Sequence, residues 1–202
     1  MMMRFLIIYS LFLTIAFLGC GDSPKVPQGP LPYLGESKIL SSGETEYYQI
    51  PVFGFVDQDS SWVTNETVED KIYVTDFFFT SCLSICPKMK QQMKRVYEAY
   101  QGDEEIVLLS HTIDPNYDSV AVLKEYAQDM DLQGNQWRFL TGEKDSIYAM
   151  GERYFVAANE DPNSQDGFYH TDVFTLMDKE RRVRGVYHGT DSIEVKALIR
   201  DI

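Results

Sequence analysis

The chain has 202 residues, and its 31 acidic residues outnumber its 18 basic ones, giving a formal net charge of −13. This acidic balance argues against nucleic acids and anionic lipid surfaces as partners, and the length suits a single domain with one sizeable core. Three cysteines are too few for a structural disulfide framework, so a close pair among them indicates chemistry rather than scaffolding.

The first 19 residues are predicted to be a leader rather than part of the fold. Arg4 precedes an apolar run over 5–18 that is too short for a transmembrane helix. The run ends in Leu18-Gly19-Cys20, which resembles a bacterial lipoprotein signal in which Cys20 becomes the lipidated first residue. An ordinary signal peptide and an uncleaved anchor are the alternatives. We therefore expect an exported protein, lipid-anchored to a bacterial membrane and facing the periplasm.

A tether is predicted to follow the leader. Residues 20–46 contain four prolines and little periodicity, which is typical of a linker. The domain is predicted to span 47–202 and to open with strands over 50–56 and 62–64. An apolar, aromatic run over 71–79 has the character of a fully buried central strand.

The central strand leads into a loop with two thiols, and the chain restarts as a helix at Pro87. Proline is favoured at the first helical position because its missing N–H would have no partner there anyway. Cys86 is therefore placed at the helix start, with Cys82 one turn earlier in the loop. Two such sulfurs can bridge each other, hold one metal ion, or simply be small buried residues. The helix dipole, with Lys88 and Lys90, is expected to lower the pKa of Cys86.

The rest of the chain alternates helices and strands. The predicted elements are a helix over 87–100, a strand over 105–111, a helix from Asp118 or Ser119 to 130, a strand over 137–140, a helix over 143–155, an acidic loop over 157–168, a hairpin of strands 169–177 and 183–188, and a last helix with a capping box of Asp191 and Glu194. This order predicts an α/β fold, a central mixed sheet with helices on both faces and an N-terminal β-hairpin extension.

Several motifs together resemble the Sco/SenC family of thioredoxin-fold copper-binding proteins. They are Cys82-x-x-x-Cys86-Pro87, Ile113-Asp114-Pro115-x-x-Asp118, Trp137-Arg138-Phe139-Leu140-Thr141-Gly142, and His170 ahead of a hairpin with Leu176-x-Asp178 and Arg184-Gly185-x-Tyr187-x-Gly189. The resemblance covers about residues 50–200. It implies a thioredoxin-like fold and a role in assembling the dinuclear copper centre of cytochrome c oxidase.

The resemblance also implies a ligand set for a copper ion, which is Cys82, Cys86 and His170. Two soft thiolates and one imidazole suit Cu(I) and can hold Cu(II), whereas a tetrahedral zinc site would want a fourth ligand. His170 precedes the strand that passes beside the dithiol in a thioredoxin fold, where thiol oxidoreductases carry a cis-proline. His111 and His188 are interpreted as ordinary core or surface histidines.

We interpret the chain as a copper metallochaperone, a binding and transfer protein without substrate turnover. The implied partners are the copper-bearing subunit of cytochrome c oxidase, an upstream copper donor and a thiol reductant, with the membrane contacted only through the lipid anchor. The alternative is a thiol–disulfide oxidoreductase in which Cys82 and Cys86 reduce the cysteines of the oxidase copper site. A copper or redox sensor is a third interpretation.

Three acidic residues lie near the motifs, and two of them, Asp76 and Asp114, have two interpretations each. Asp76, six positions before Cys82, resembles the buried acid beneath thioredoxin dithiols, which would exchange a proton during disulfide chemistry. Its other interpretation is a hydrogen-bonded strand residue. Asp118 is most simply a helix cap, and Asp114 is either a group near the metal or a turn residue before Pro115.

Overall fold

The computed structural model describes residues 29–202, of which Leu31–Ile202 form one compact unit. The predicted leader and Cys20 lie outside the described residues. Within the described range, no helix combines the length and the apolar character needed to cross a bilayer.

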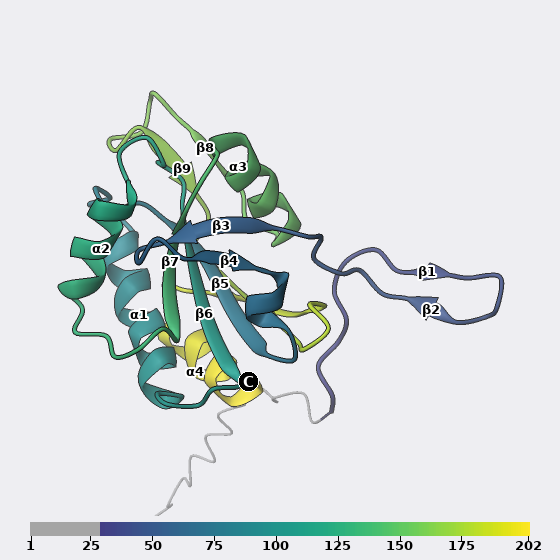
Figure 1. The fold of residues 1–202 in the computed structure, drawn as a ribbon. Coiled ribbons are helices and arrows are strands. Elements are labelled where there is room, and N and C mark those ends of the chain that lie inside the picture. The colour runs from purple at the N-terminus through teal and green to yellow at the C-terminus, as the bar shows by residue number, and fades with distance from the viewer. Residues whose placement is uncertain (1–28) are drawn as a thin grey trace, which may run out of the picture. The chain divides into compact units, whose positions relative to one another are not determined.

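A seven-stranded mixed sheet forms the centre of this unit (Figure 1). Its strands, in spatial order, are β11 (Val183–His188), β10 (Val173–Met177), β5 (Ile72–Phe78), β6 (Ile106–Thr112), β7 (Trp137–Thr141), β3 (Gly54–Asp57) and β4 (Trp62–Thr64). The strands β5, β6 and β7 run parallel, and the other neighbours are antiparallel. The α/β prediction is confirmed, and β3 and β4 form the expected N-terminal hairpin.

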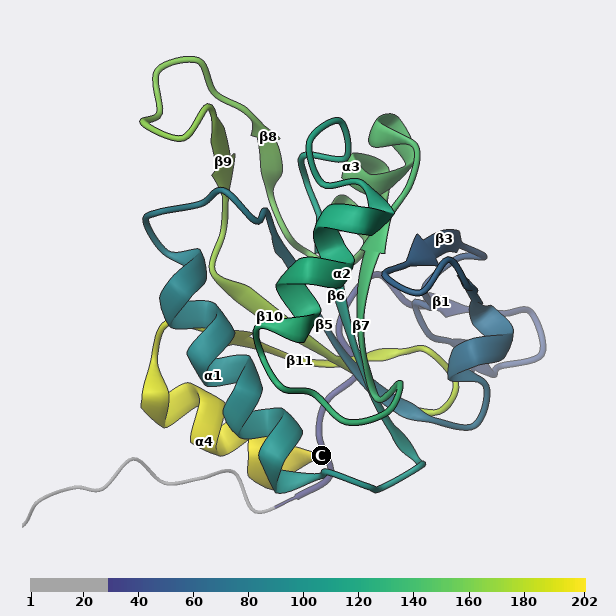
Figure 2. The same cartoon turned by 60° about the vertical axis from the view of Figure 1, so that its left-hand side comes forward.

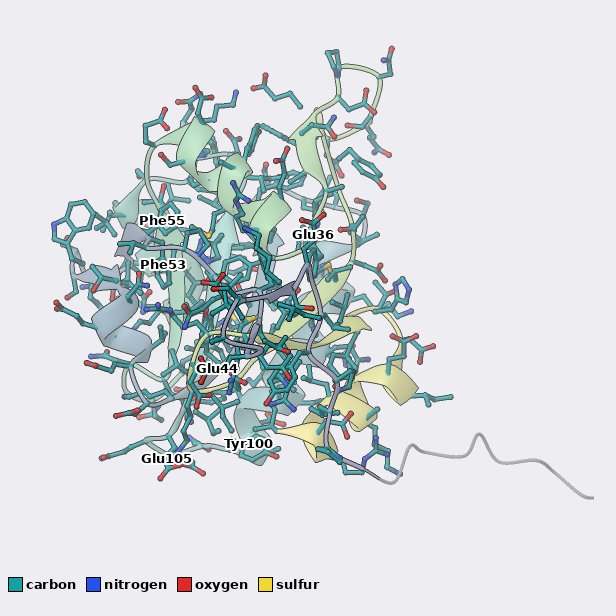
Figure 3. All side chains as sticks on the ribbon, turned by 90° about the vertical axis from the view of Figure 1, so that its right-hand side faces the viewer. Glu36, Glu44, Phe53, Phe55, Tyr100 and Glu105 are labelled. Carbon is teal, nitrogen blue, oxygen red and sulfur yellow. The ribbon has the colours of Figure 1, made fainter. Side chains whose placement is uncertain are left out.

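Helices cover both faces of the sheet. They are α1 (Cys86–Ala99), α2 (Val120–Gln128), α3 (Lys144–Arg153) and α4 (Ser192–Asp201), and a 3₁₀ turn, η1 (Asn65–Val68), follows β4. The crossovers through α1 and α2 step the same way along the sheet, so their right-handedness places both helices on one face. Helix α4 lies beside α1, where Tyr100 donates a hydrogen bond to the Ile199 carbonyl at 2.6 Å, and α3 covers the opposite face (Figures 2 and 3).

Neighbouring aromatic residues of β5 fill the two faces separately, because side chains alternate along a strand. Phe78 stacks on Tyr126 of α2 with a centroid separation of 5.3 Å. Phe77 points the other way, stacks on the ring of His111 and contacts Tyr154 on the α3 side. Because both faces of β5 are covered, its apolar residues do not alternate with polar ones; only Thr75 and Asp76 among its seven residues are polar.

The compact unit begins earlier than the predicted boundary at residue 47. A short exposed hairpin of β1 (Lys38–Ile39) and β2 (Thr45–Glu46) lies within the predicted linker. Ahead of it, Arg184 donates a hydrogen bond to the Pro32 carbonyl at 3.0 Å and lies over the ring of Tyr33 at 4.3 Å. The residue that contacts this segment, Arg184, lies far downstream in the chain. The composition of the segment by itself therefore resembles that of a linker. Residues from Leu31 onward therefore belong to the folded unit.

The predicted acidic loop over 157–168 contains a strand, and the predicted strand over 169–177 is two strands. In the structure β8 (Ala158–Glu160) pairs antiparallel with β9 (Phe168–His170), and His170 lies opposite Ala158. The chain then bends before β10 joins the main sheet. Strands of three residues are too short to show an alternation in the sequence, which is why the hairpin was missed. The bend leaves His170 at the end of β9.

The last helix starts where predicted, but its capping box is incomplete. The Asp191 side chain accepts a hydrogen bond from the Ile193 N–H at 2.7 Å and caps α4. Glu194 does not reach back to Asp191, because its carboxylate accepts from the His188 N–H at 2.6 Å. The N–H of Asp191 bonds instead to the His188 carbonyl.

Candidate metal centre

The two thiols lie in the connection that leaves the carboxyl end of β5. Cys82 follows the strand and donates its N–H to the Phe79 carbonyl at 3.3 Å. Cys86 is the first residue of α1, with Pro87 directly behind it, as the sequence predicts. Leu83 between them is 78% exposed, whereas Cys82 and Cys86 are 6% and 4% exposed. The sulfurs therefore face inward from a loop whose middle points to solvent.

His170 reaches the thiols from the end of β9. Its Nε2 lies 3.2 Å from the sulfur of Cys86. Its Nδ1 lies 3.1 Å from the Thr171 carbonyl, which can only accept a hydrogen bond, so the proton of the neutral ring sits on Nδ1. Nε2 is then left with its lone pair facing the sulfurs. Such a hydrogen bond on the second ring nitrogen is the usual way of orienting a metal-binding histidine.

One atom each of Cys82, Cys86 and His170 together form a group with all separations within 4.8 Å. The loop from β5 to α1 runs close to the end of β9 in Figure 2, which is how distant parts of the chain supply one group. All three side chains are buried, with His170 6% exposed. The structure thus brings together the three residues that the sequence analysis proposed, and both cysteines are free thiols.

A pocket of about 210 Å³ adjoins the group. It is lined by Phe79, Ser84, Ile85, Phe168, Tyr169 and His170. Tyr169 is 49% exposed at its rim. The group is therefore buried but lies just below the surface, within reach of a ligand that a partner presents.

The two sulfurs differ in acidity, and not in the order expected. Hydrogen bonding from Cys86 lowers the pKa of Cys82, while the same hydrogen bond and burial raise the pKa of Cys86. The expected lowering at the helix start is therefore wrong for Cys86, because the neighbouring Cys82 sulfur and burial both raise its pKa. A metal ion that takes both sulfurs requires both of them to be deprotonated.

Asp76 lies on the same side of β5 as α1 and is buried at 4% exposure. It accepts a hydrogen bond from the Ser110 hydroxyl at 2.5 Å, and Ser110 in turn accepts from the Trp137 indole at 2.8 Å. Burial raises the pKa of Asp76 to about 6, although Ser110 and nearby His170 oppose that rise. Both interpretations of Asp76 are thus compatible with its position, since it is hydrogen-bonded within the sheet and its raised pKa lets it exchange a proton in the range of about pH 5 to 7.

Asp118 is not the helix cap that the sequence favours. Ser119 is the N-cap of α2, where its hydroxyl accepts from the Val122 N–H. Asp118 is fully buried and accepts hydrogen bonds from Thr80 and Thr112 instead. Both residue types cap helices well, so the choice depended on burial, which the local sequence does not report.

Asp114 is a turn residue. Its carbonyl accepts from the N–H groups of Tyr117 and Asp118, and its own N–H donates to Thr112. None of the hydrogen bonds described for it leads to the sulfurs. The turn interpretation is therefore the one that the structure favours.

The other two histidines stand apart from the group. His111 is fully buried against Phe77 and Phe55, and neither of its ring nitrogens has a hydrogen-bond partner among residues 29–202. His188 is a surface residue whose Nδ1 lies 2.9 Å from Asp172. Both were interpreted as ordinary core or surface residues, and the structure agrees.

The SCO1/SenC family model matches residues 43–202. The chain belongs to the SCO1/SenC family. Among curated Sco proteins, the SCO1 protein homolog of Bacillus subtilis (strain 168) is 28% identical over 157 residues, covering 77% of this chain and 81% of the relative.

Solved structures of Sco proteins share the fold. A SCO1/SenC family lipoprotein from Bacillus anthracis str. Ames is 24% identical, with a TM-score of 0.69 over 76% of this chain and 92% of that one. Bradyrhizobium japonicum ScoI with copper bound is also 24% identical, with a TM-score of 0.63 over 75% and 98% of the two chains. These likenesses confirm the thioredoxin-like fold, and copper is the ion present in the second relative.

Sequence reasoning missed the hydrogen-bond partners of the buried Asp76 and Asp118 in this Sco protein. Ser110 is placed beside Asp76 by the parallel register of β5 and β6, and Trp137 lies on the next strand. Thr80 and Thr112 were missed for the same reason. The signal that could have indicated these hydrogen bonds is the presence of threonine and serine in apolar strands, because a buried hydroxyl group needs a hydrogen-bond partner.

Proposed function

We propose that this chain is a copper metallochaperone that holds Cu(I) or Cu(II) through Cys82, Cys86 and His170. The observation that carries the proposal is the meeting of two sulfurs and one imidazole nitrogen within 4.8 Å. Soft sulfur ligands select Cu(I), and an imidazole extends the set to Cu(II). The orientation of His170 by the Thr171 carbonyl fits this use, because it leaves Nε2 as the free ligand atom.

The burial of the group suits a carrier. Copper is the cargo, and the protein's part is to keep three ligands together while admitting a partner's ligands. The adjoining pocket and the exposed Leu83 lie where a partner would approach. Loading requires both sulfurs to be deprotonated, so copper binding and release should depend on pH.

The proposed client is the dinuclear copper centre of cytochrome c oxidase. This follows from membership of the SCO1/SenC family and from the motif resemblance, with an upstream copper donor and a thiol reductant as further partners. We place the chain outside the cytoplasm, anchored through lipid on Cys20 and facing the periplasm. The Bacillus anthracis relative is described as a lipoprotein, which supports that placement.

Complementation with point variants tests the proposal. In cells that lack the chain, a plasmid copy should restore the copper content of the purified oxidase, and Cys82→Ser, Cys86→Ser and His170→Ala copies should not. His188→Ala is the matched control, because it removes an exposed histidine outside the group. Full copper content in the oxidase without the chain would reject this client.

The second candidate is a thiol–disulfide oxidoreductase. The thiolate of Cys82 would attack a substrate disulfide, and the first substrate sulfur would leave as a thiolate. Cys86 would then lose its proton and close the disulfide with Cys82, passing two electrons to the substrate and releasing its second sulfur. The low pKa of Cys82 and the buried Asp76 favour this candidate. The contact of His170 Nε2 with the Cys86 sulfur favours the first, because it adds a nitrogen ligand that disulfide exchange does not need.

A further inference from the structure

Asp118 is a fully buried carboxylate whose hydrogen bonds tie three segments together. It accepts from the Thr80 N–H at 3.1 Å, from the Thr80 hydroxyl, and from the Thr112 hydroxyl at 2.5 Å. Thr80 lies just beyond β5, Thr112 ends β6, and Asp118 precedes α2. A buried carboxylate is costly unless donors surround it, so this arrangement holds only while all three segments stay in place.

Thr80 is the point at which the chain leaves the sheet for the dithiol loop. Both its backbone N–H and its hydroxyl are fixed by one carboxylate, which sets the direction of the chain two residues before Cys82. Beyond it, Ser81, Leu83 and Ser84 are exposed, and Cys82 is held by its N–H bond to Phe79 and a 3.5 Å contact with Ser84. The place of the Cys82 sulfur therefore depends on the anchor at Thr80.

The other two members of the group have anchors of their own. Cys86 is fixed by α1, and His170 by β9 and its bond to the Thr171 carbonyl. Neither of these involves Asp118. A change at Asp118 should thus displace one sulfur and leave the other two ligand atoms where they are.

We propose that Asp118 is a positioning residue that, through Thr80, holds the Cys82 sulfur where it can share one copper ion with Cys86 and His170. This proposal rests on the proposed function and assigns a role to a residue that the sequence presented as a helix cap. It predicts that the Asp118–Thr80 link governs copper affinity and dithiol chemistry more than it governs folding. Removal of groups that orient metal ligands typically costs about 10–100-fold in affinity.

Asp118→Asn is the main test, because it keeps the shape and loses the acceptor for one hydroxyl. In the full chain, purified in detergent with its thiols reduced, the Cu(I) affinity should fall about tenfold or more, and the sulfur-to-Cu(II) absorption should weaken. Thr80→Val should reproduce both effects, and Thr80→Ser should keep wild-type values. Wild-type copper affinity and spectrum in both Asp118→Asn and Thr80→Val would overturn the proposal, whatever happens to their melting temperatures.

Asp57→Asn is the matched control for general destabilisation. Asp57 is a buried carboxylate that also accepts three hydrogen bonds, from the N–H groups of Asp59 and Ser61 and from Arg138, in the turn after β3. This variant should lose stability without a change in the copper spectrum. Loss of copper affinity in Asp57→Asn equal to that in Asp118→Asn would show that folding, not positioning, is the cause.

A measurement without copper separates this proposal from the proposed function. The equilibrium between the reduced pair and the Cys82–Cys86 disulfide, measured against a glutathione buffer, depends on how closely the sulfurs are held. It should shift at least fivefold in Asp118→Asn and stay unchanged in Asp57→Asn. If the wild-type chain binds no copper, the metallochaperone function fails, and an unshifted disulfide equilibrium would then reject the positioning role as well.

Discussion

The sulfur of Cys86 lies 3.2 Å from Nε2 of His170, although 84 positions separate the two residues in the chain. One residue starts α1, and the other ends β9. The contact exists because the chain bends between β9 and β10, which leaves the imidazole over the dithiol rather than within the sheet. This relationship adds an imidazole to the two thiols, so that three side chains that could hold one metal ion lie together.

Asp76 should matter more for disulfide chemistry than for copper. Asp76→Asn keeps the hydrogen bond with Ser110 possible but removes the group that takes up a proton. We expect the reduction of model disulfides to fall about tenfold, while copper transfer to a soluble oxidase copper domain changes less than twofold. Both rates are measurable with the full chain in detergent. Equal losses in the two rates would contradict this division of roles.

The same residue should affect the pH dependence of stability. Burial raises the pKa of Asp76 from 3.8 to about 6, so the folded state binds a proton more tightly than the unfolded state does. The contribution of Asp76 to the free energy of unfolding is therefore greatest below pH 3.8. It falls as the pH rises to 6, by at most ~3 kcal/mol. Asp76→Asn should remove that fall in urea titrations between these pH values. An unchanged pH profile would show that Asp76 is ionised at little cost.

His111 should make the stability of the fold depend on pH in the opposite direction to Asp76. Burial lowers the pKa of this histidine to about 3, well below its value of 6.5 in an unfolded chain. The unfolded state then binds the extra proton, so stability is full above pH 6.5 and falls towards pH 3, by at most ~5 kcal/mol.

The variant His111→Leu tests this directly. Neither ring nitrogen has a hydrogen-bond partner in the part of the chain that the structure describes, so an apolar side chain of similar volume should be tolerated among Phe77, Phe55 and Tyr154. In the variant, the free energy of unfolding measured with urea should change much less between pH 4 and pH 6.5 than it does in the wild type. An acid sensitivity equal to that of the wild type would mean that other groups dominate in this range.

Cys20 should carry lipid in the mature protein. Cys20→Ala is expected to leave the precursor uncut or to release the chain from the membrane fraction, because lipid on Cys20 is the proposed anchor. Intact mass spectrometry of the mature chain checks this, with residues 20–202 plus the adduct as the expected mass. A mature chain without an adduct on Cys20 would show that another type of leader is present.

The sequence was sufficient where the determining pattern is local. The apolar run of β5, the Cys82-x-x-x-Cys86 spacing and the proline at the start of α1 predicted the dithiol and its setting. His170 was found only through a family resemblance, because the fold alone brings it to the thiols. Physical reasoning from spacing could not have chosen it among three histidines.

The features that were missed depend on long-range pairing. The β8–β9 hairpin has strands of three residues, too short for an alternation to show. The docking of the segment around Tyr33 depends on Arg184, about 150 positions away. Asp118 and Ser119 are both residue types that cap helices well. The structure buries Asp118, because the ends of β5 and β6 meet the start of α2 there, and leaves Ser119 as the cap. In each case the structure was determined by a contact between residues that are distant in the sequence, which the local pattern does not report.

Copper titration of the reduced full chain, with and without His170, tests the central claim most directly. The wild type should bind one copper ion per chain in either oxidation state. His170→Ala should lose about 100-fold or more in Cu(II) affinity and less than about tenfold in Cu(I) affinity, because the softer ion keeps both thiolates while the harder one depends more on nitrogen. His188→Ala should match the wild type. Affinities for both ions that do not change in His170→Ala would remove this histidine from the site and contradict the account.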